Sequence, residues 1–202
     1  MANDVTTGIR WVRNLLGGRM PIEEGVVISN QSGSIFTGDP VKRVSDGTFI
    51  VAAGGDTVIY GVCAGVKQYK TAAGVVQGGN YLPTGTTYTG APNLENPQAS
   101  IIRIIPTRFQ EFEMDMNTAA ATLTAAQDLV GNNCDVSVGT GSTTTGRSAC
   151  VADNSSTGTG TANVRIREVV RTPKNDVTAA NWKALVEFVE GNAASPTSAT
   201  GV

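Results

Sequence analysis

Three carboxylates alternate along the short segment 108–115 (RFQEFEMD), where single apolar residues separate Glu111, Glu113 and Asp115. Successive side chains of a β-strand point to opposite faces, so this spacing places all three carboxylates on one face of a strand. Glycosidases use a pair of carboxylates, and hard cations prefer oxygen ligands, so hydrolysis and weak cation binding are the chemistries to consider. A half-exposed strand with a polar outer face produces the same alternation, and we favour that interpretation.

Histidine is absent from the 202 residues. Its absence excludes Ser-His-Asp and Cys-His catalytic sets, imidazole general bases and most zinc ligand sets. Cys63, Cys134 and Cys150 form no CxxC pair, which argues against a zinc knuckle or a thioredoxin-like site. We favour free buried thiols over a Cys134–Cys150 bridge, because synthesis in the cytosol disfavours disulfides. We therefore expect a protein that is not an enzyme and holds no cofactor or metal.

Two further segments carry polar chemistry. Residues 139–148 (GTGSTTTGRS) are rich in glycine but lack the Gly-Lys-Ser/Thr ending of a phosphate-binding loop, so they predict a polar hairpin loop. The local basic cluster contains Arg165, Arg167 and Arg171, and the first two share a face of a predicted strand. Two interpretations stay open for this cluster, the solvated face of an edge strand and a contact with acidic residues of another subunit.

The overall charge argues against two classes of partner. The 15 basic and 17 acidic side chains give a formal net charge of −2, which is too balanced for a protein whose main partner is a nucleic acid. No apolar stretch approaches the roughly 20 residues that span a bilayer, so we expect no membrane partner. The N-terminus also lacks the pattern of a signal peptide, and we expect synthesis in the cytosol.

Short β-branched runs cut by turn residues dominate the segment 34–66 (SIFTGDPVKRVSDGTFIVAAGGDTVIYGVCAGV). Runs of four to seven residues between Gly-Asp-Pro, Asp-Gly and Gly-Gly-Asp are typical of an antiparallel meander. The turn positions expected from this pattern are Gly38, Asp39, Pro40, Gly61 and Gly65. The strands expected along the whole chain are 26–29, 35–36, 41–44, 48–52, 58–66, 101–106, 108–115, 135–138, 148–151, 163–170 and 183–190.

These elements predict a mainly β fold in four parts. An N-terminal arm (1–24) precedes a main antiparallel lobe (25–115), which resembles a barrel or sandwich and contains a long irregular loop at 70–100. A smaller β-rich lobe (116–192) and a flexible tail (193–202) follow.

At most one or two short helices are expected. The best candidate begins at Thr124, whose hydroxyl and the Gln127 amide resemble a capping box, and ends at Gly131.

The arm mixes apolar and basic residues. Its spacing fits helical turns weakly, and short isolated helices are marginal in water, so an extended arm is favoured. A tryptophan in a mobile arm is costly unless something buries it. The arm therefore packs either on a neighbouring molecule or on the chain's own lobe, through the candidate anchors Ile9, Arg10, Trp11, Arg13 and Leu15.

The order and spacing of several short motifs resemble the capsid decoration proteins, also called cement proteins, of tailed bacteriophages. These motifs are TGDPV at 37–41, SDGT at 45–48, GVCAGV at 61–66, LTAAQDLVG at 123–131 and VRI at 164–166. Cys134, Cys150 and the 70–100 loop have no counterpart in this resemblance.

The resemblance implies a structural virion protein, made in the host cytoplasm, that binds the outer surface of a capsid and bridges subunits of the major capsid protein. A homo-oligomer is implied, with a trimer favoured. The arm would then bind the capsid, and the arginine cluster would meet acidic residues of the capsid lattice.

Two rival functions come from the residues themselves. Loops 70–100 and 139–160 suit a tail- or fibre-associated module that binds host glycans, with Tyr69, Tyr81 and Tyr88 as stacking platforms. The alternating carboxylates of 111–115 suit a glycan hydrolase.

Overall fold

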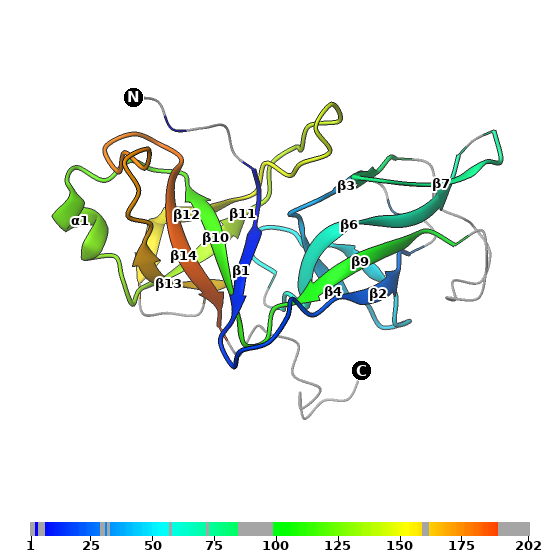
Figure 1. The fold of residues 1–202 in the computed structure, drawn as a ribbon, viewed down its shortest axis with the longest axis horizontal. Coiled ribbons are helices and arrows are strands. Elements are labelled where there is room, and N and C mark those ends of the chain that lie inside the picture. Colours follow the sequence, from blue (N-terminus) through cyan, green and yellow to red (C-terminus); the bar gives the residue numbers. More distant parts are fainter. Residues whose placement is uncertain are drawn as a thin grey trace.

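The computed structural model describes residues 3, 7–28, 31, 33–56, 58–71, 73–84, 99–158 and 162–189. Of these residues, 48% lie in strands and 3% in one short helix, so the prediction of a mainly β fold is confirmed. Two β lobes lie side by side, and strand β1 (Arg10–Asn14) runs along the face of one lobe where it approaches the other (Figure 1).

One lobe is a closed five-stranded barrel in the order β10-β12-β11-β13-β14, with β14 pairing back to β10. The pairing of β10 with β12 is a parallel bridge between Met116 and Ala152. All other strand pairings in the barrel are antiparallel. The strands are β10 (Gln110–Met116), β11 (Asn133–Ser137), β12 (Val151–Gly158), β13 (Val164–Val169) and β14 (Trp182–Phe188).

The barrel interior follows from the two-residue period of its strands. In β14 every second side chain is buried, starting from Trp182, whose indole N–H donates to the Thr118 carbonyl at 2.9 Å. Phe112 and Phe188 meet edge to face with ring centroids 5.4 Å apart. Cys134 and Cys150 are fully buried in the same core and free, as is the buried Cys63, so the prediction of free thiols is confirmed.

The second lobe is a curved sheet in the order β2-β9-β6-β4-β5, whose two edges meet through the Val27–Phe49 bridge. Strand β7 extends the sheet from β6, and β3 and β8 form a separate ribbon. The strands are β2 (Glu23–Val26), β3 (Ile35–Phe36), β4 (Pro40–Arg43), β5 (Phe49–Val51), β6 (Gly61–Lys70), β7 (Val76–Gly79), β8 (Tyr81–Leu82) and β9 (Ile101–Pro106).

Several elements differ from the sequence-based expectations. The sequence pattern predicts β10 in the same lobe as the residues before it, but its hydrogen bonds join it to β14, β12 and β1. Part of the expected 70–100 loop forms β7 and β8, while 85–98 and the tail 193–202 lie outside the described residues.

The predicted capping box is also wrong. Helix α1 (Leu123–Gln127) is capped by Thr122, whose hydroxyl accepts the Ala125 N–H at 3.1 Å. The backbone of Thr122 is already extended, so the cap lies two residues before the predicted Thr124.

The expected turn residues play two different roles. Gly38 lies in a turn. Its φ of 95° is in the left-handed region, which glycine adopts without the strain that a side chain would cause. Pro40 begins β4, a position that proline tolerates. Gly61 and Gly65, by contrast, lie within β6, and a Cβ on Gly61 would lie 2.3 Å from Ile104 Cγ2. Close packing of β6 on β9, and not a turn, therefore requires glycine at position 61.

Among the described residues, the lobes are joined where segments 7–9, 36–40 and 146–150 meet, and also by the hydrogen bond from the Asn163 side-chain amide to the Asp56 carbonyl at 2.6 Å. The Ile9 N–H donates to the Gly38 carbonyl at 3.1 Å, and the Ser148 N–H donates to the Thr37 carbonyl at 2.9 Å. One apolar cluster also runs through both lobes, since it includes Val62 and Ile105 together with the barrel interior. We call the contact between segments 7–9, 36–40 and 146–150 the lobe junction.

The Phe112 ring is the clearest test of the barrel core. Phe112→Ala should lower the free energy of unfolding by about 3–5 kcal/mol, because the ring is fully buried and its loss leaves a cavity. Phe109→Ala is a matched control, since that ring is 39% exposed and should cost below about 1 kcal/mol. Urea unfolding measures both, and equal losses would contradict the assignment of Phe112 to the core.

Candidate interaction site

Strand β1 places the arm on the chain's own barrel. It pairs antiparallel with β10, with Arg10 opposite Glu113 and Arg13 opposite Glu111. Ile9 is buried in the core, and the Trp11 indole N–H donates to Gln110 Oε1 at 2.8 Å. The Leu15 N–H donates to the Phe109 carbonyl at 2.8 Å, which ends the pairing. All five candidate anchors of the arm are thus held by this chain itself.

Two of the alternating carboxylates of β10 pair with arginines of β1. All three carboxylates share one face, as predicted, but they are not half-exposed: the residues are 1%, 9% and 2% exposed at Glu111, Glu113 and Asp115. Arg13 Nε lies 2.6 Å from Glu111 Oε2, and Arg10 Nη2 lies 2.7 Å from Glu113 Oε1. The expected polar outer face is therefore covered, and part of its cover is β1, which lies about a hundred residues earlier in the sequence.

The third carboxylate meets a cation from the other neighbouring strand. Lys183 Nζ of β14 lies 2.6 Å from Asp115 Oδ1, and the Thr7 N–H donates to Asp115 Oδ2 at 3.3 Å. Burial raises the pKa of Asp115, and Lys183 opposes that shift. Each carboxylate of the set thus has its own cation, so ion pairing with β1 and β14 accounts for the alternation. No cluster of three or more metal-ligating side chains occurs among the described residues.

Two of the three clustered arginines extend this charged face. Arg167 Nη1 lies 2.9 Å from Glu187 Oε2, and Arg165 Nη1 lies 4.0 Å from Glu187 Oε1. Both arginine side chains stay more than 40% exposed, so these ion pairs leave them open to solvent.

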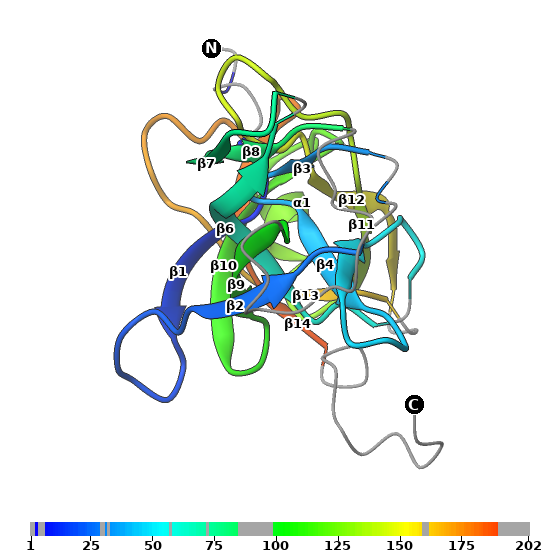
Figure 2. The same ribbon diagram turned by 90° about the vertical axis from the view of Figure 1, so that its right-hand side faces the viewer.

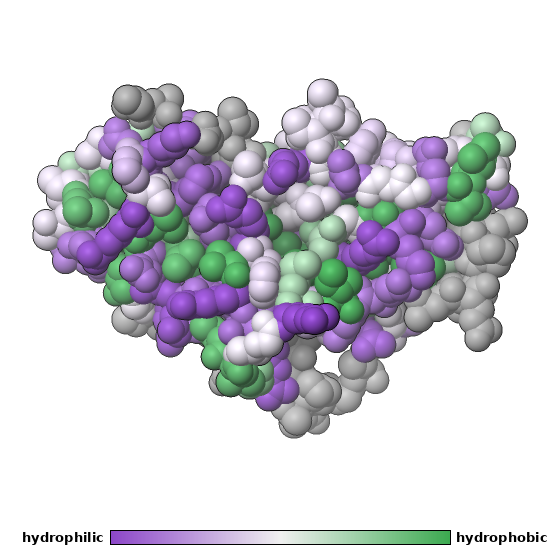
Figure 3. Space-filling model, in the orientation of Figure 1, coloured by the Kyte–Doolittle hydropathy of each residue, from purple (hydrophilic) through white to green (hydrophobic). Residues whose placement is uncertain are grey.

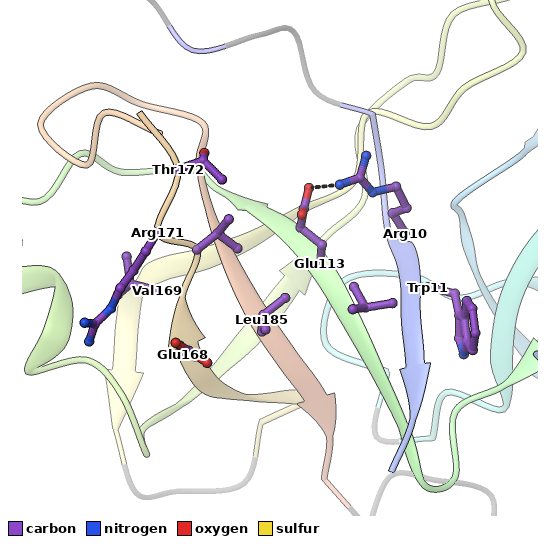
Figure 4. A pocket seen from close by; sticks show the side chains of 10 residues that line it. Arg10, Trp11, Glu113, Glu168, Val169, Arg171, Thr172 and Leu185 are labelled. Carbon is purple, nitrogen blue, oxygen red and sulfur yellow. Dashed lines mark hydrogen bonds and ion pairs between the residues drawn. The ribbon is translucent and has the colours of Figure 1, made fainter. Parts of the chain in front are cut away.

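A shallow groove of about 470 Å³ crosses the same face, and Arg171 lies on its rim (Figure 4). Arg10 and Glu113 form one side, Leu185 forms part of the floor, and Glu168 lies on the opposite side. The groove therefore presents mixed charge around a small apolar floor.

An exposed apolar surface lies where β1 ends. We define the apolar tip as Leu16, Met20, Ile22 and Phe109, which are 74%, 39%, 49% and 39% exposed. One green patch lies at the lower end of the molecule, below β1 (Figure 3), and the loop after β1 projects from the body (Figure 2). The Leu15–Phe109 hydrogen bond joins the two segments that form the tip. Such grouped apolar side chains on a surface are typical of an interaction site.

Three of the four tip residues, Leu16, Met20 and Ile22, lie within the predicted arm (1–24). The segment 15–22 (LLGGRMPI) combines turn residues with apolar ones, and Gly17 and Gly18 both adopt positive φ. Phe109 also has a positive φ of 58°, which is rare for an aromatic residue and keeps its ring at the turn between β9 and β10. The Arg108 guanidinium lies 4.8 Å from the centre of that ring.

The tyrosines proposed as stacking platforms are largely occupied. Tyr81 stacks on Phe36 with ring centroids 5.2 Å apart, and Tyr69 is buried with its hydroxyl accepting from the Gln77 amide at 2.6 Å. Tyr88 lies outside the described residues. Loop 139–148 forms a tight turn closed by the Ser142–Arg147 bridge and packs against the other lobe at the lobe junction.

No protein family, curated protein or solved structure matches this chain. Within the described part of the chain, none of the helical structure has the length and apolar character needed to cross a bilayer.

The Arg13–Glu111 pair tests how β1 is held. Arg13→Met should lower the free energy of unfolding by about 2–3 kcal/mol, because it leaves the Glu111 carboxylate buried without a cation. A fully buried pair would lose roughly 3–5 kcal/mol, but the Arg13 side chain is 62% exposed. Arg167→Met is the control, with an expected loss below about 1 kcal/mol, since Glu187 is more exposed and keeps Arg165 nearby. Chemical denaturation measures both, and an equal loss would contradict a special role for Arg13.

Proposed function

We propose that this protein is a non-enzymatic capsid decoration protein that binds the outer surface of a tailed-phage capsid and stabilises contacts between subunits of the major capsid protein. The observation that carries the proposal is the apolar tip, a projecting group of exposed apolar side chains that the described residues leave uncovered. The major capsid protein is proposed as the partner because of the motif resemblance: TGDPV, GVCAGV and VRI occur in the order found in that family.

In this proposal, the first part of the N-terminal segment binds the barrel and the second part binds the capsid. Ile9, Arg10, Trp11 and Arg13 bind the barrel, and they hold the tip in a fixed place. Leu16, Met20 and Ile22 then meet the capsid. This arrangement lowers the ordering cost of binding, because the strand that carries the loop is already fixed.

Binding of this kind is passive and depends on repetition. A fully buried Leu or Ile side chain contributes about 1.5–3 kcal/mol, so one tip gives a modest affinity. The homotrimer that the resemblance favours would present three tips and raise the overall affinity without a new contact. The exposed parts of Arg165, Arg167 and Arg171 would add polar contacts to acidic residues of the lattice.

Co-sedimentation with matching mature capsids stripped of this protein tests the proposal. The full chain should bind saturably, and Leu16→Ser with Ile22→Ser should weaken binding at least about tenfold, because two apolar side chains are lost from the contact. The matched control is Leu123→Ser with Val130→Ser, which removes two exposed apolar residues around α1 and should leave binding unchanged. Thermal unfolding of each variant checks that the fold persists.

Two outcomes would contradict the proposal. No binding of the full chain to intact capsids would remove the decoration function and direct the search to host-surface glycans. Binding that is unaffected by the tip variant would leave a capsid protein but place its contact elsewhere, for example at the arginine cluster.

A further inference from the structure

A buried carboxyl that no cation of the described residues pairs with lies at the lobe junction. Asp39 is 2% exposed, and its Oδ2 accepts the Phe36 N–H at 2.8 Å. Its Oδ1 is buried and makes no hydrogen bond of standard geometry among the described residues, although the Ser148 hydroxyl lies close enough to favour the charged form. Buried charges are normally paired, because transfer of an isolated carboxylate out of water is very costly. Asp39 therefore stands apart from Glu111, Glu113 and Asp115, each of which has a cation.

Backbone hydrogen bonds tie Asp39 to the joint between the lobes. The Cys63 N–H donates to the Asp39 carbonyl at 2.8 Å, and the preceding Gly38 N–H donates to the Cys63 carbonyl at 2.8 Å. Thr37, two residues before Asp39, donates to the Gly146 carbonyl and accepts from the Ser148 N–H. The 36–40 turn, which holds Asp39, thus belongs to one lobe and binds the other.

Within the three described segments of the lobe junction, the titratable groups supply no compensating positive charge next to Asp39. The thiol of Cys63 on β6 has its pKa raised to about 12 by burial, and burial raises the pKa of Cys150, in the 146–150 segment, well above its ordinary value of 9.0. Both thiols are therefore neutral at physiological pH. Arg147 in the same segment is exposed, and residues 7–9 of the third segment carry no titratable side chain.

We propose that Asp39 is a proton-operated latch between the two lobes, which holds the lobe junction closed when its carboxyl is neutral and loosens it when the carboxyl ionises. The neutral acid removes the cost of a buried charge. The ionised form draws water into the junction or separates the 36–40 turn from the 146–150 segment. This inference is independent of the capsid function.

The direction of the pH dependence follows from burial. Burial raises the pKa of Asp39 above its ordinary value of 3.8, and the Ser148 hydroxyl and Phe36 amide oppose this shift by less. The folded protein therefore binds this proton more tightly than the unfolded chain does. The resulting stabilisation is complete below the unfolded pKa and is lost as the pH rises through the folded pKa.

Hydrogen exchange across a pH series tests the latch, with Asp39→Asn as a neutral mimic. The protection factor of the Ser148 amide in the natural protein should fall relative to that of the variant as the pH rises. The expected fall is about tenfold for every pH unit between the unfolded and folded pKa of Asp39. Asp115 contributes a slope of the same sign, but it is present in both proteins and cancels.

Asp46→Asn is the control. Asp46 is exposed, and hydrogen bonds from the Thr48 hydroxyl and amide lower its pKa, so its contribution to stability has the opposite sign and is lost as the pH falls. A direct measurement guards against failure of a variant to fold: the ¹³C shift of the Asp39 carboxyl in the natural protein should titrate above 3.8. A midpoint at or below that value, or equal pH slopes for the natural protein and Asp39→Asn, would overturn the latch.

Discussion

The structure depends on neutralising the carboxylates of one strand. Strand β10 places aromatic and sulfur-containing side chains inside the barrel and three acidic side chains outside, and the outer set is buried as well. Carboxylates can be buried only beside cations or hydrogen-bond donors, so β10 requires partners on both edges. Strand β1 supplies two arginines and β14 supplies one lysine. Electrostatics therefore decides where the N-terminal segment lies, and apolar burial of Ile9 and Trp11 completes the attachment.

Once β1 is fixed, it sets the positions of two distant features. Its first residues lead into the lobe junction through Ile9 and Gly38, and its last residues lead into the apolar tip through Leu15 and Phe109. A surface loop attached to a paired strand at one end and to β2 at the other retains few conformations. The exposed apolar side chains of the tip are consequently presented in a defined arrangement, although nothing in the described chain packs over them.

Local patterns in the sequence predicted many elements but not their partners, and the predicted strands 26–29 and 148–151 overlap β2 and β12 by one residue each. The strands at 35–36 and 101–106 were predicted with the observed bounds, because β-branched runs and turn residues are local signals. The alternation around Glu113 also predicted the correct shared face. It did not show that Arg10 would cover that face, since the two residues are 103 positions apart and a period of two is the same for a covered and a solvated strand. The grouping of β10 with the wrong lobe has the same cause, because pairing with β14 is a long-range property.

The order of the barrel strands has a consequence for how the chain folds. Strand β10 pairs with β14, the last described strand, and β14 also closes the sheet beside β13. A chain emerging from the ribosome can form the second lobe and pair β1 with β10 before synthesis ends. Asp115 can form its ion pair with Lys183 only after residue 183 has been made. Such pairings between distant segments are slow to form because loop closure must precede them. Synthesis of the C-terminal strand is therefore the event that commits the barrel to its final topology.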